Sequence, residues 1–179
     1  MTYWLTTHWP PRRSEDEALR IYLAEGREGP GARIAVGDLV FVYEAASGRT
    51  LVEHLPSGAT RPVPCRRGRA GIILLGRVTA TLALDKTTHP EQYVDGTTTW
   101  WRWRAPLEVV SRRGFVPRPD VARALGYRLT YNFHGFGEQH SGLLQLSEAR
   151  FAKLEGLFHS SRPRQPRRDP LPRGSKNEF

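Results

Sequence analysis

Two strongly apolar runs rich in β-branched residues, joined by a polar segment without a helical pattern, restrict the possible folds of this chain more than any other feature. Residues 39–43 (Leu-Val-Phe-Val-Tyr) form the first run, and residues 71–84 form the second. This composition favours strands, and we expect the second run to be one long strand bent at Gly76. Residues 45–69 are rich in Gly, Ser, Pro and Arg, which predicts a loop with one weak hairpin near residues 50–54.

The N-terminal segment predicts one strand and one helix. Residues 3–7 are aromatic and β-branched and are followed by Pro10, so they predict a short strand that ends abruptly. Ser14 and Glu17 have the spacing of a capping box ahead of an apolar run, which predicts a helix over residues 15–25. The apolar spacing within that segment suits a helix with one buried face.

The remaining elements are short. Residues 97–110 predict another strand pair or one bent strand, residues 119–125 predict a helix stopped by Gly126, and residues 147–158 predict a final helix capped by Ser147. The total is five or six strands with two or three short helices, without the regular strand–helix alternation of a parallel α/β sheet. We therefore expect an α+β fold, a small β-barrel flanked by short helices.

Length and charge bound the domain organisation and the partner. The chain of 179 residues suits a single domain, which we expect to span residues 1–159. Residues 160–179 are basic and rich in Pro and Arg, and they predict a linker or disordered tail. The net charge is +9, and all but three of the 27 Lys and Arg residues are arginines. A polyanionic partner would explain this charge, and so would the arginine bias of a GC-rich genome.

Cysteine usage and hydropathy limit the compartment and the metal chemistry. Cys65 is the only cysteine, which excludes a disulfide within the chain and a thiolate zinc cluster. The N-terminal residues lack a basic segment followed by an apolar run, and no stretch has the length needed to span a bilayer. We expect a cytoplasmic protein that is neither exported nor embedded in a membrane.

No group of residues has the pattern of a catalytic or cofactor site. The six histidines show no His-Glu-x-x-His or other short ligand spacing. No phosphate-binding loop, dinucleotide-binding glycine motif or Gly-x-Ser-x-Gly occurs either. Cys65 lies beside Arg66, but no residue is identifiable as a base that would orient it, which favours a spectator thiol. We therefore expect no metal, no cofactor and no enzymatic activity in this chain.

Five tryptophans gather at two places: Trp4 and Trp9 at the first strand, and Trp100, Trp101 and Trp103 in one later segment. If that segment is a strand, Trp101 and Trp103 face one side while Trp100 faces the other. One face could fill the barrel while the other stacks on bases, with Arg102 and Arg104 contacting phosphates between the indoles. The alternative is that all three indoles only cover the barrel and its helices.

Four segments, in this order, resemble the EVE domain. They are Tyr3-Trp4-Leu5 followed by Pro10; Val36-Gly37-Asp38-Leu39-Val40-Phe41-Val42-Tyr43; Gly71-Ile72-Ile73-Leu74-Leu75-Gly76-Arg77-Val78; and Leu146-Ser147-Glu148 with Phe151. The resemblance covers about residues 1–158 and implies a PUA-like barrel, the superfamily that EVE domains share with YTH and ASCH modules. The chain departs from the usual family pattern after the first strand, where Thr7-His8-Trp9-Pro10 replaces Lys-Ser-Glu-Pro and brings a bulky aromatic residue to the expected pocket.

The resemblance implies a reader of modified nucleobases. YTH relatives hold methylated adenine in RNA, and some EVE domains are fused to HNH nucleases that cut DNA with modified cytosine. Such readers flip the base out and enclose it between aromatic planes. For this chain we expect 5-methylcytosine or 5-hydroxymethylcytosine in DNA, read by the specificity domain of a modification-dependent restriction system with a fused or partner HNH-type nuclease. An RNA-binding protein that recognises modified bases is the alternative, and an enzyme acting on a nucleotide is a third, weaker hypothesis.

The expected base pocket combines the ends of two strands with the tryptophan segment: His8, Trp9, Tyr43, Glu44, Trp100, Trp101 and Trp103. The aromatic residues would sandwich the base. His8 or Glu44 would read its polar edge, and Glu44 could accept a hydrogen bond from a cytosine amino group. The residues expected to contact phosphates are Arg66, Arg67, Arg69, Arg102 and Arg104. Binding should therefore weaken steeply with salt.

Overall fold

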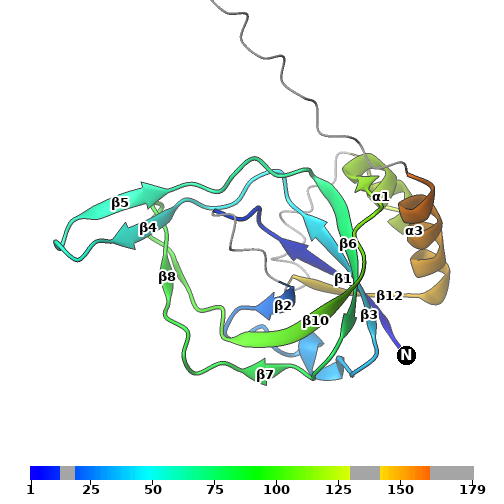
Figure 1. The fold of residues 1–179 in the computed structure, drawn as a ribbon, viewed down its shortest axis with the longest axis horizontal. Coiled ribbons are helices and arrows are strands. Elements are labelled where there is room, and N and C mark those ends of the chain that lie inside the picture. Colours follow the sequence, from blue (N-terminus) through cyan, green and yellow to red (C-terminus); the bar gives the residue numbers. More distant parts are fainter. Residues whose placement is uncertain (13–18, 130–141, 162–179) are drawn as a thin grey trace, which may run out of the picture.

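The structure, a computed structural model, describes residues 1–12, 19–129 and 142–161, and a strongly curled mixed sheet lies at its centre (Figure 1). The strands are β1 (Tyr3–His8), β2 (Arg20–Leu23), β3 (Leu39–Glu44), β4 (Leu51–His54), β5 (Thr60–Val63), β6 (Gly71–Val78), β7 (Ala83–Leu84), β8 (Glu91–Gln92), β9 (Thr98–Thr99), β10 (Trp103–Ser111), β11 (Val116–Pro117) and β12 (Leu143–Leu146). The helices are the 3-10 helix η1 (Pro30–Arg33) and the α-helices α1 (Arg118–Leu125) and α3 (Glu148–Ser160).

Six strands follow one another across the sheet in the order β12-β1-β3-β6-β10-β2, with β11 added beside β6 and β7 beside β10. The strands β1 and β3 are parallel, and the other neighbouring pairs on this path are antiparallel. Two separate hairpins join β4 to β5 and β8 to β9. The first begins at the expected position, with β4, but extends through β5 into the stretch expected to be a loop. A curled path of six strands with short helices confirms the expected fold class, a small α+β barrel.

The curled sheet has one face covered by helices and one inner face. Figure 1 shows α1 and α3 packed on one side of the sheet, and the core beneath them includes Phe41, Leu154 and Phe158. A second core on the inner face includes Trp4 and Val40. Because side chains alternate along a strand, β3 sends Phe41 toward the helices and Val40 to the inner face. Only the inner face is left to border an open cavity.

The turn before β3 fixes one tryptophan in the inner core. Gly37 has a φ of +91°, a left-handed conformation that favours glycine. Asp38 is 1% exposed and accepts hydrogen bonds from Trp4 Nε1 at 2.9 Å and from the Thr2 N–H at 2.7 Å. Because the buried indole and the buried carboxylate satisfy each other, Trp4 and the Gly37-Asp38 pair serve the fold.

The parallel pair β1–β3 brings two polar side chains together at one end of the sheet. His8 and Glu44 are register partners, and each is the last residue of its strand. His8 is an even number of residues from Trp4 on β1, and Glu44 is an even number of residues from Val40 on β3. Both therefore lie on the inner face with Trp4 and Val40. The sheet therefore ends in a His–Glu pair on the face that the helices leave free.

The expected helix over residues 15–25 is wrong where the structure describes that segment. Arg20–Leu23 is the strand β2, paired with β10, and its alternate residues Ile21 and Leu23 are fully buried. Burial with a period of two outweighs a capping pattern, because pairing and packing contribute more than local helix propensity. Residues 13–18, which contain the capping box, lie outside the described residues.

Two expectations about strands also need correction. The long strand expected over residues 71–84 ends at Val78, and Leu82 packs against the inner core before the separate strand β7 begins. The strand β12 was not expected from its sequence, although it forms the sheet edge beside β1. Helices α1 and α3 begin and end close to the expected residues. Nearly all of the expected tail lies outside the described residues.

Candidate functional site

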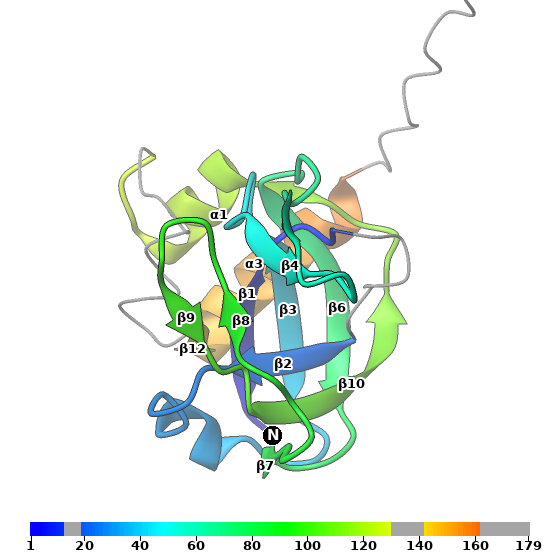
Figure 2. The same ribbon diagram turned by 90° about the vertical axis from the view of Figure 1, so that its left-hand side faces the viewer.

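A cavity of about 850 Å³ lies on the inner side of the curled sheet. Its lining comes from the ends of β1 and β3, from β2, β6 and β10, and from the hairpin β4–β5 with β8, which Figure 2 shows in front of the sheet. Val42 and Leu74 of the inner core border it as well. Ligand sites in proteins usually measure about 300–1,000 Å³, so the cavity has the size of a binding site.

Two indoles from remote segments form one wall of the cavity. Trp9, just after β1, and Trp101, just before β10, meet edge to face with ring centroids 5.6 Å apart and an interplanar angle of 84°. Trp9 makes a similar edge contact with Tyr93, at 5.6 Å and 81°. Gly48 lies against Trp9 so closely that a Cβ there would be 2.8 Å from the indole. Glycine at position 48 is thus required for the close packing behind this wall.

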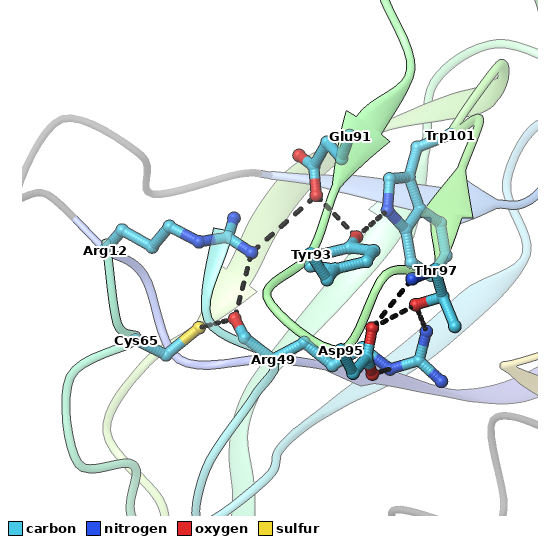
Figure 3. Close-up of polar contacts among 8 residues, drawn as sticks. All are labelled: Arg12, Arg49, Cys65, Glu91, Tyr93, Asp95, Thr97 and Trp101. Atoms are coloured by element: carbon cyan, nitrogen blue, oxygen red, sulfur yellow. Dashed lines mark hydrogen bonds and ion pairs between the residues drawn. The ribbon is translucent and has the colours of Figure 1, made fainter. Parts of the chain in front are cut away.

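A polar network beside this wall holds Trp101 (Figure 3). Trp101 Nε1 donates a hydrogen bond to the Tyr93 hydroxyl at 3.0 Å, and that hydroxyl donates to Glu91 Oε2 at 2.6 Å. Arg12 Nη2 lies 3.7 Å from Glu91 Oε2 and donates to the Arg49 carbonyl at 3.3 Å. Burial, and then the hydrogen bond to Glu91, raise the pKa of Tyr93 above its ordinary value, so the hydroxyl stays protonated.

Arg49 extends the network to the β8–β9 turn. Its Nη1 donates to Thr97 Oγ1 at 2.9 Å, and its guanidinium lies over the Tyr93 ring, 5.4 Å from the centroid. The Cys65 thiol is directed at the Arg49 carbonyl, with 3.6 Å between sulfur and oxygen. These contacts give Arg49 and Cys65 a place in the packing behind the indoles, outside the cavity lining.

A second part of the wall is built around Tyr22 of β2. The His8 ring meets the Tyr22 ring edge-on, with centroids 5.9 Å apart. The Arg104 guanidinium lies over the same ring, 5.4 Å from its centroid, while its Nη1 pairs with Asp85 at 2.8 Å. A cation held over an aromatic face is a favourable arrangement beside a site that takes anions or flat rings.

His8 lines the cavity as a neutral ring. Burial lowers its pKa to about 4, and a hydrogen bond with the Arg20 backbone partly opposes this shift. Nε2 is sealed from solvent and has no hydrogen-bond partner among the described residues. His8 therefore offers ring surface to a ligand, and Nε2 becomes available only if the ring turns.

The Glu44 side chain lines the cavity, and one of its carboxylate oxygens is bound by Arg69. Its Oε1 accepts a hydrogen bond from the Arg69 backbone N–H at 2.7 Å and lies 3.6 Å from Arg69 Nε. Oε2 has no hydrogen-bond partner within the described part of the chain. The side chain is only 13% exposed, so Oε2 is a hydrogen-bond acceptor in a confined space.

The structure brings half of the predicted site residues into the cavity lining: His8, Trp9, Glu44, Arg69, Trp101 and Arg104. The other predicted residues lie outside the lining: Tyr43, Arg66, Arg67, Trp100, Arg102 and Trp103. Two features of the strands explain this division. Neighbouring residues of a strand face opposite sides of the sheet. Residues 100–102 precede β10, so they do not alternate as strand residues.

The residues outside the lining have identifiable places. Tyr43 belongs to the core beneath the helices and is 2% exposed, and burial raises its pKa to about 12. Trp103 packs against the inner core. Trp100 lies under the Arg102 guanidinium, 4.1 Å from its ring centroid, and Arg102 pairs with Glu25 at 2.7 Å. None of these three aromatic rings forms a wall of the cavity.

Arg66 and Arg67 lie next to the segment that borders the cavity, although they do not line it. Both are exposed, and neither forms an ion pair with another described residue. The Arg66 N–H donates a hydrogen bond to the Pro11 carbonyl at 3.3 Å. This bond connects the loop that contains Arg66 and Arg67 to the residues that follow Trp9.

Sequence reasoning missed several lining residues: Arg12, Arg20, Tyr22, Glu91 and Arg112. The alternation of Arg20 and Tyr22 with the buried Ile21 and Leu23 is the signal that could have placed two of them on a strand. The complete lining contains five arginines and three glutamates, so it is basic on balance. Among the described residues, no group of three or more His, Cys, Asp or Glu side chains could hold a metal ion. No helix in the described ranges has the length and hydropathy to cross a membrane.

The fold and the site define a small α+β barrel with an aromatic, basic-lined cavity on its inner face. Among solved structures, the chain is similar to a hypothetical protein from Leishmania major, with 13% identity over 87% of this chain and 93% of that chain and a TM-score of 0.50, which shows a shared fold. It is also similar to human THYN1 in complex with DNA containing 5-methylcytosine, with 15% identity over 88% of this chain and 97% of that chain and a TM-score of 0.49. No family model and no curated protein matches the sequence.

Proposed function

We propose that this chain is a nucleic-acid reader of the EVE kind, which holds one extruded base in the cavity beside Trp9 and Trp101. The preferred ligand is 5-methylcytosine or 5-hydroxymethylcytosine in DNA. The observation that carries the proposal is the meeting of two indoles and the Glu44 carboxylate in one cavity with a basic lining. An extruded base needs flat surfaces for stacking and a polar group for its edge, and its phosphates need cations.

The energetics favour binding but limit the discrimination between bases. Extrusion of a base costs a few kcal/mol, and aromatic stacking returns about 1–3 kcal/mol per base. A buried methyl group adds only about 0.8 kcal/mol, roughly fourfold in Kd. The remaining discrimination would have to come from polar contacts, for which the Glu44 Oε2 acceptor suits the cytosine amino group.

The arginines around the cavity suit contacts with the phosphate backbone. Arg20 and Arg112 line the cavity and are exposed. Arg66, which is bonded to Pro11, and its neighbour Arg67 are also exposed, and neither forms an ion pair within the described part of the chain. Arg104 has its charge already matched by Asp85, so it is better placed to hold Tyr22 than to bind a phosphate. Phosphate contacts would position the strand, while the cavity reads the base.

A module that only recognises a modified base needs a partner that acts on the DNA it binds. We therefore propose that the chain is the specificity module of a modification-dependent restriction system, with an HNH-type nuclease fused or recruited to it. Cleavage of modified DNA by this chain together with such a nuclease, and not by the nuclease alone, would test this part of the proposal.

A direct test compares binding of equal-length probes by fluorescence anisotropy: DNA with unmodified, C5-methylated or hydroxymethylated cytosine, and RNA with methylated adenine. We expect the modified DNA to bind best. Trp101→Ala should remove most of that preference, whereas Trp100→Ala, an indole outside the cavity, should retain it. A preference for the RNA would replace the DNA proposal with the RNA alternative, and equal effects of the two variants would contradict the pocket.

A further inference from the structure

The hairpin β4–β5 projects from the barrel on the side away from α1 and α3 (Figure 1). It is a sheet of its own, and a bridge between Leu51 and Tyr93 connects it to the rest of the chain. The inner core and the helix-covered core both lack hairpin residues. A projecting hairpin that contributes to neither core is available for a role outside the fold.

The base of this hairpin borders the cavity. Leu51, Glu53 and Val63 belong to the cavity lining. The turn at the tip comprises residues 55–59, which begin only two residues beyond Glu53. At about 3.3 Å per residue, the tip starts about 7 Å from a lining residue. This separation is comparable to about two steps of stacked bases, because successive bases lie about 3.4 Å apart along a strand.

The tip is uncharged, largely exposed and closed by hydrogen bonds. Its sequence is Leu-Pro-Ser-Gly-Ala, and residues 56–59 are exposed. Two hydrogen bonds close the turn, from the Leu55 N–H to the Ala59 carbonyl at 2.8 Å and from the Gly58 N–H to the Leu55 carbonyl at 2.9 Å. Gly58 has a φ of +83°, which suits glycine in such a turn. A closed turn loses little conformational entropy when it is inserted between other groups.

Cations accompany this uncharged tip. Arg61 on the outgoing strand has its charge matched by Glu53, but the chain after β5 continues to Arg66 and Arg67, which are exposed and form no ion pair with another described residue. An apolar tip on a basic support is the arrangement by which proteins insert side chains between base steps while cations hold the flanking phosphates.

We propose that the tip of the β4–β5 hairpin, residues 55–59, inserts into a DNA duplex at the position left by the extruded base, while the base of the same hairpin lines the cavity that receives it. This inference rests on the proposed function. It assigns to the hairpin a role that is needed only for duplex DNA, because a single strand has no gap in a base stack to fill.

The test compares two probes with the full chain: a duplex with one 5-methylcytosine, and its modified strand alone. Two tip variants are used, Leu55→Ser with Pro56→Ser, and Ala59→Asp at an exposed position. We expect each to weaken duplex binding roughly tenfold or more and single-strand binding less than twofold. Val94→Ser, which removes an apolar side chain that is 59% exposed outside the hairpin, serves as the matched control and should change neither affinity.

The outcomes separate this inference from the proposed function. Equal losses for duplex and single strand would show that the hairpin only shapes the cavity, and unchanged duplex binding would show that the tip does not insert; either result overturns the inference. A wild-type chain that binds neither probe overturns the proposed function and the hairpin role with it. Circular dichroism verifies folding, and Ala59→Asp decides the question if the double variant does not fold.

Discussion

Trp101 donates its indole N–H to the hydroxyl of Tyr93, 3.0 Å away, and Tyr93 is itself only 1% exposed. The same hydroxyl donates to Glu91, so one buried phenol connects a wall of the cavity to the charged network with Arg12. The orientation of the indole is thus fixed before any ligand binds, and pre-organised binding surfaces lose less entropy on association.

Tyr93→Phe tests this connection. The variant keeps the ring but leaves Trp101 Nε1 and Glu91 without their shared partner, which should reduce the free energy of unfolding by about 1–3 kcal/mol. Preference for modified DNA should fall as Trp101 loses its fixed orientation. Urea unfolding and anisotropy measure the two effects. Tyr3→Phe is the control, because the Tyr3 ring stacks on Phe151 at 4.2 Å and its hydroxyl has no hydrogen-bond partner among the described residues, so that variant should differ little from the wild type.

Glu44→Gln tests the reading of the base edge. Because the Arg69 N–H needs an acceptor at Oε1, the new amide should place its oxygen there and its NH₂ where Oε2 stood. An acceptor becomes a donor, which fits the carbonyl of thymine instead of the amino group of 5-methylcytosine. We expect the preference between single strands with these two bases to shift by roughly tenfold toward thymine.

Glu53→Gln controls for the lost charge, since Glu53 also lines the cavity but pairs with Arg61. It should leave the order of the two bases unchanged. If Glu44→Gln and Glu53→Gln shift the preference between 5-methylcytosine and thymine equally, Glu44 does not read the base.

Strand alternation explains which parts of the site could be predicted. The run 39–43 identifies β3, and a period of two places Val40, Val42 and Glu44 on one face and Tyr43 on the other. The prediction that Tyr43 and Glu44 share one pocket was therefore in conflict with the strand assignment itself. Glu44 ends β3 and Trp9 directly follows β1, so the sequence could place both at the end of a strand.

The remaining parts depend on contacts that no local pattern specifies. The edge contact of Trp9 with Trp101 joins the end of β1 to the start of β10, two strands that are separated by β3 and β6 in the sheet. The ion pair of Arg12 with Glu91 likewise joins residues that are far apart in the sequence. Such pairs are set by sheet register and curl, which follow from the packing of the whole chain. The segment 20–23 shows the same limit, because its pairing with β10 outweighs a helical signal.

We predict that His8 lowers the free energy of unfolding at acidic pH. Its folded pKa of about 4 lies below the ordinary value of 6.5, so the fold favours the neutral ring. As the pH falls from 6.5 toward 4, the unfolded chain binds a proton that the folded chain does not, and stability decreases by up to about 3 kcal/mol. Urea unfolding at pH 7.5 and 4.5 should show a smaller decrease for His8→Phe than for the wild type. His54→Ala, at an exposed position, should follow the wild type, and a wild-type decrease equal to that of His8→Phe would show that His8 does not cause it.

We predict that Arg67 contributes to the salt dependence of binding but not to the discrimination between bases. Each phosphate contact contributes about −0.9 to the slope of log K against log salt for duplex DNA, so Arg67→Ala should make the slope shallower by about that amount. The loss of affinity should be equal for modified and unmodified probes, because phosphates are the same in both. Arg77→Ala is the matched control, since Arg77 is exposed, pairs with Glu108 at 3.0 Å and does not line the cavity. An unchanged slope for Arg67→Ala would show that Arg67 does not contact a phosphate. The exposed Arg20 and Arg112 of the cavity lining would then be the candidates for the phosphate contacts.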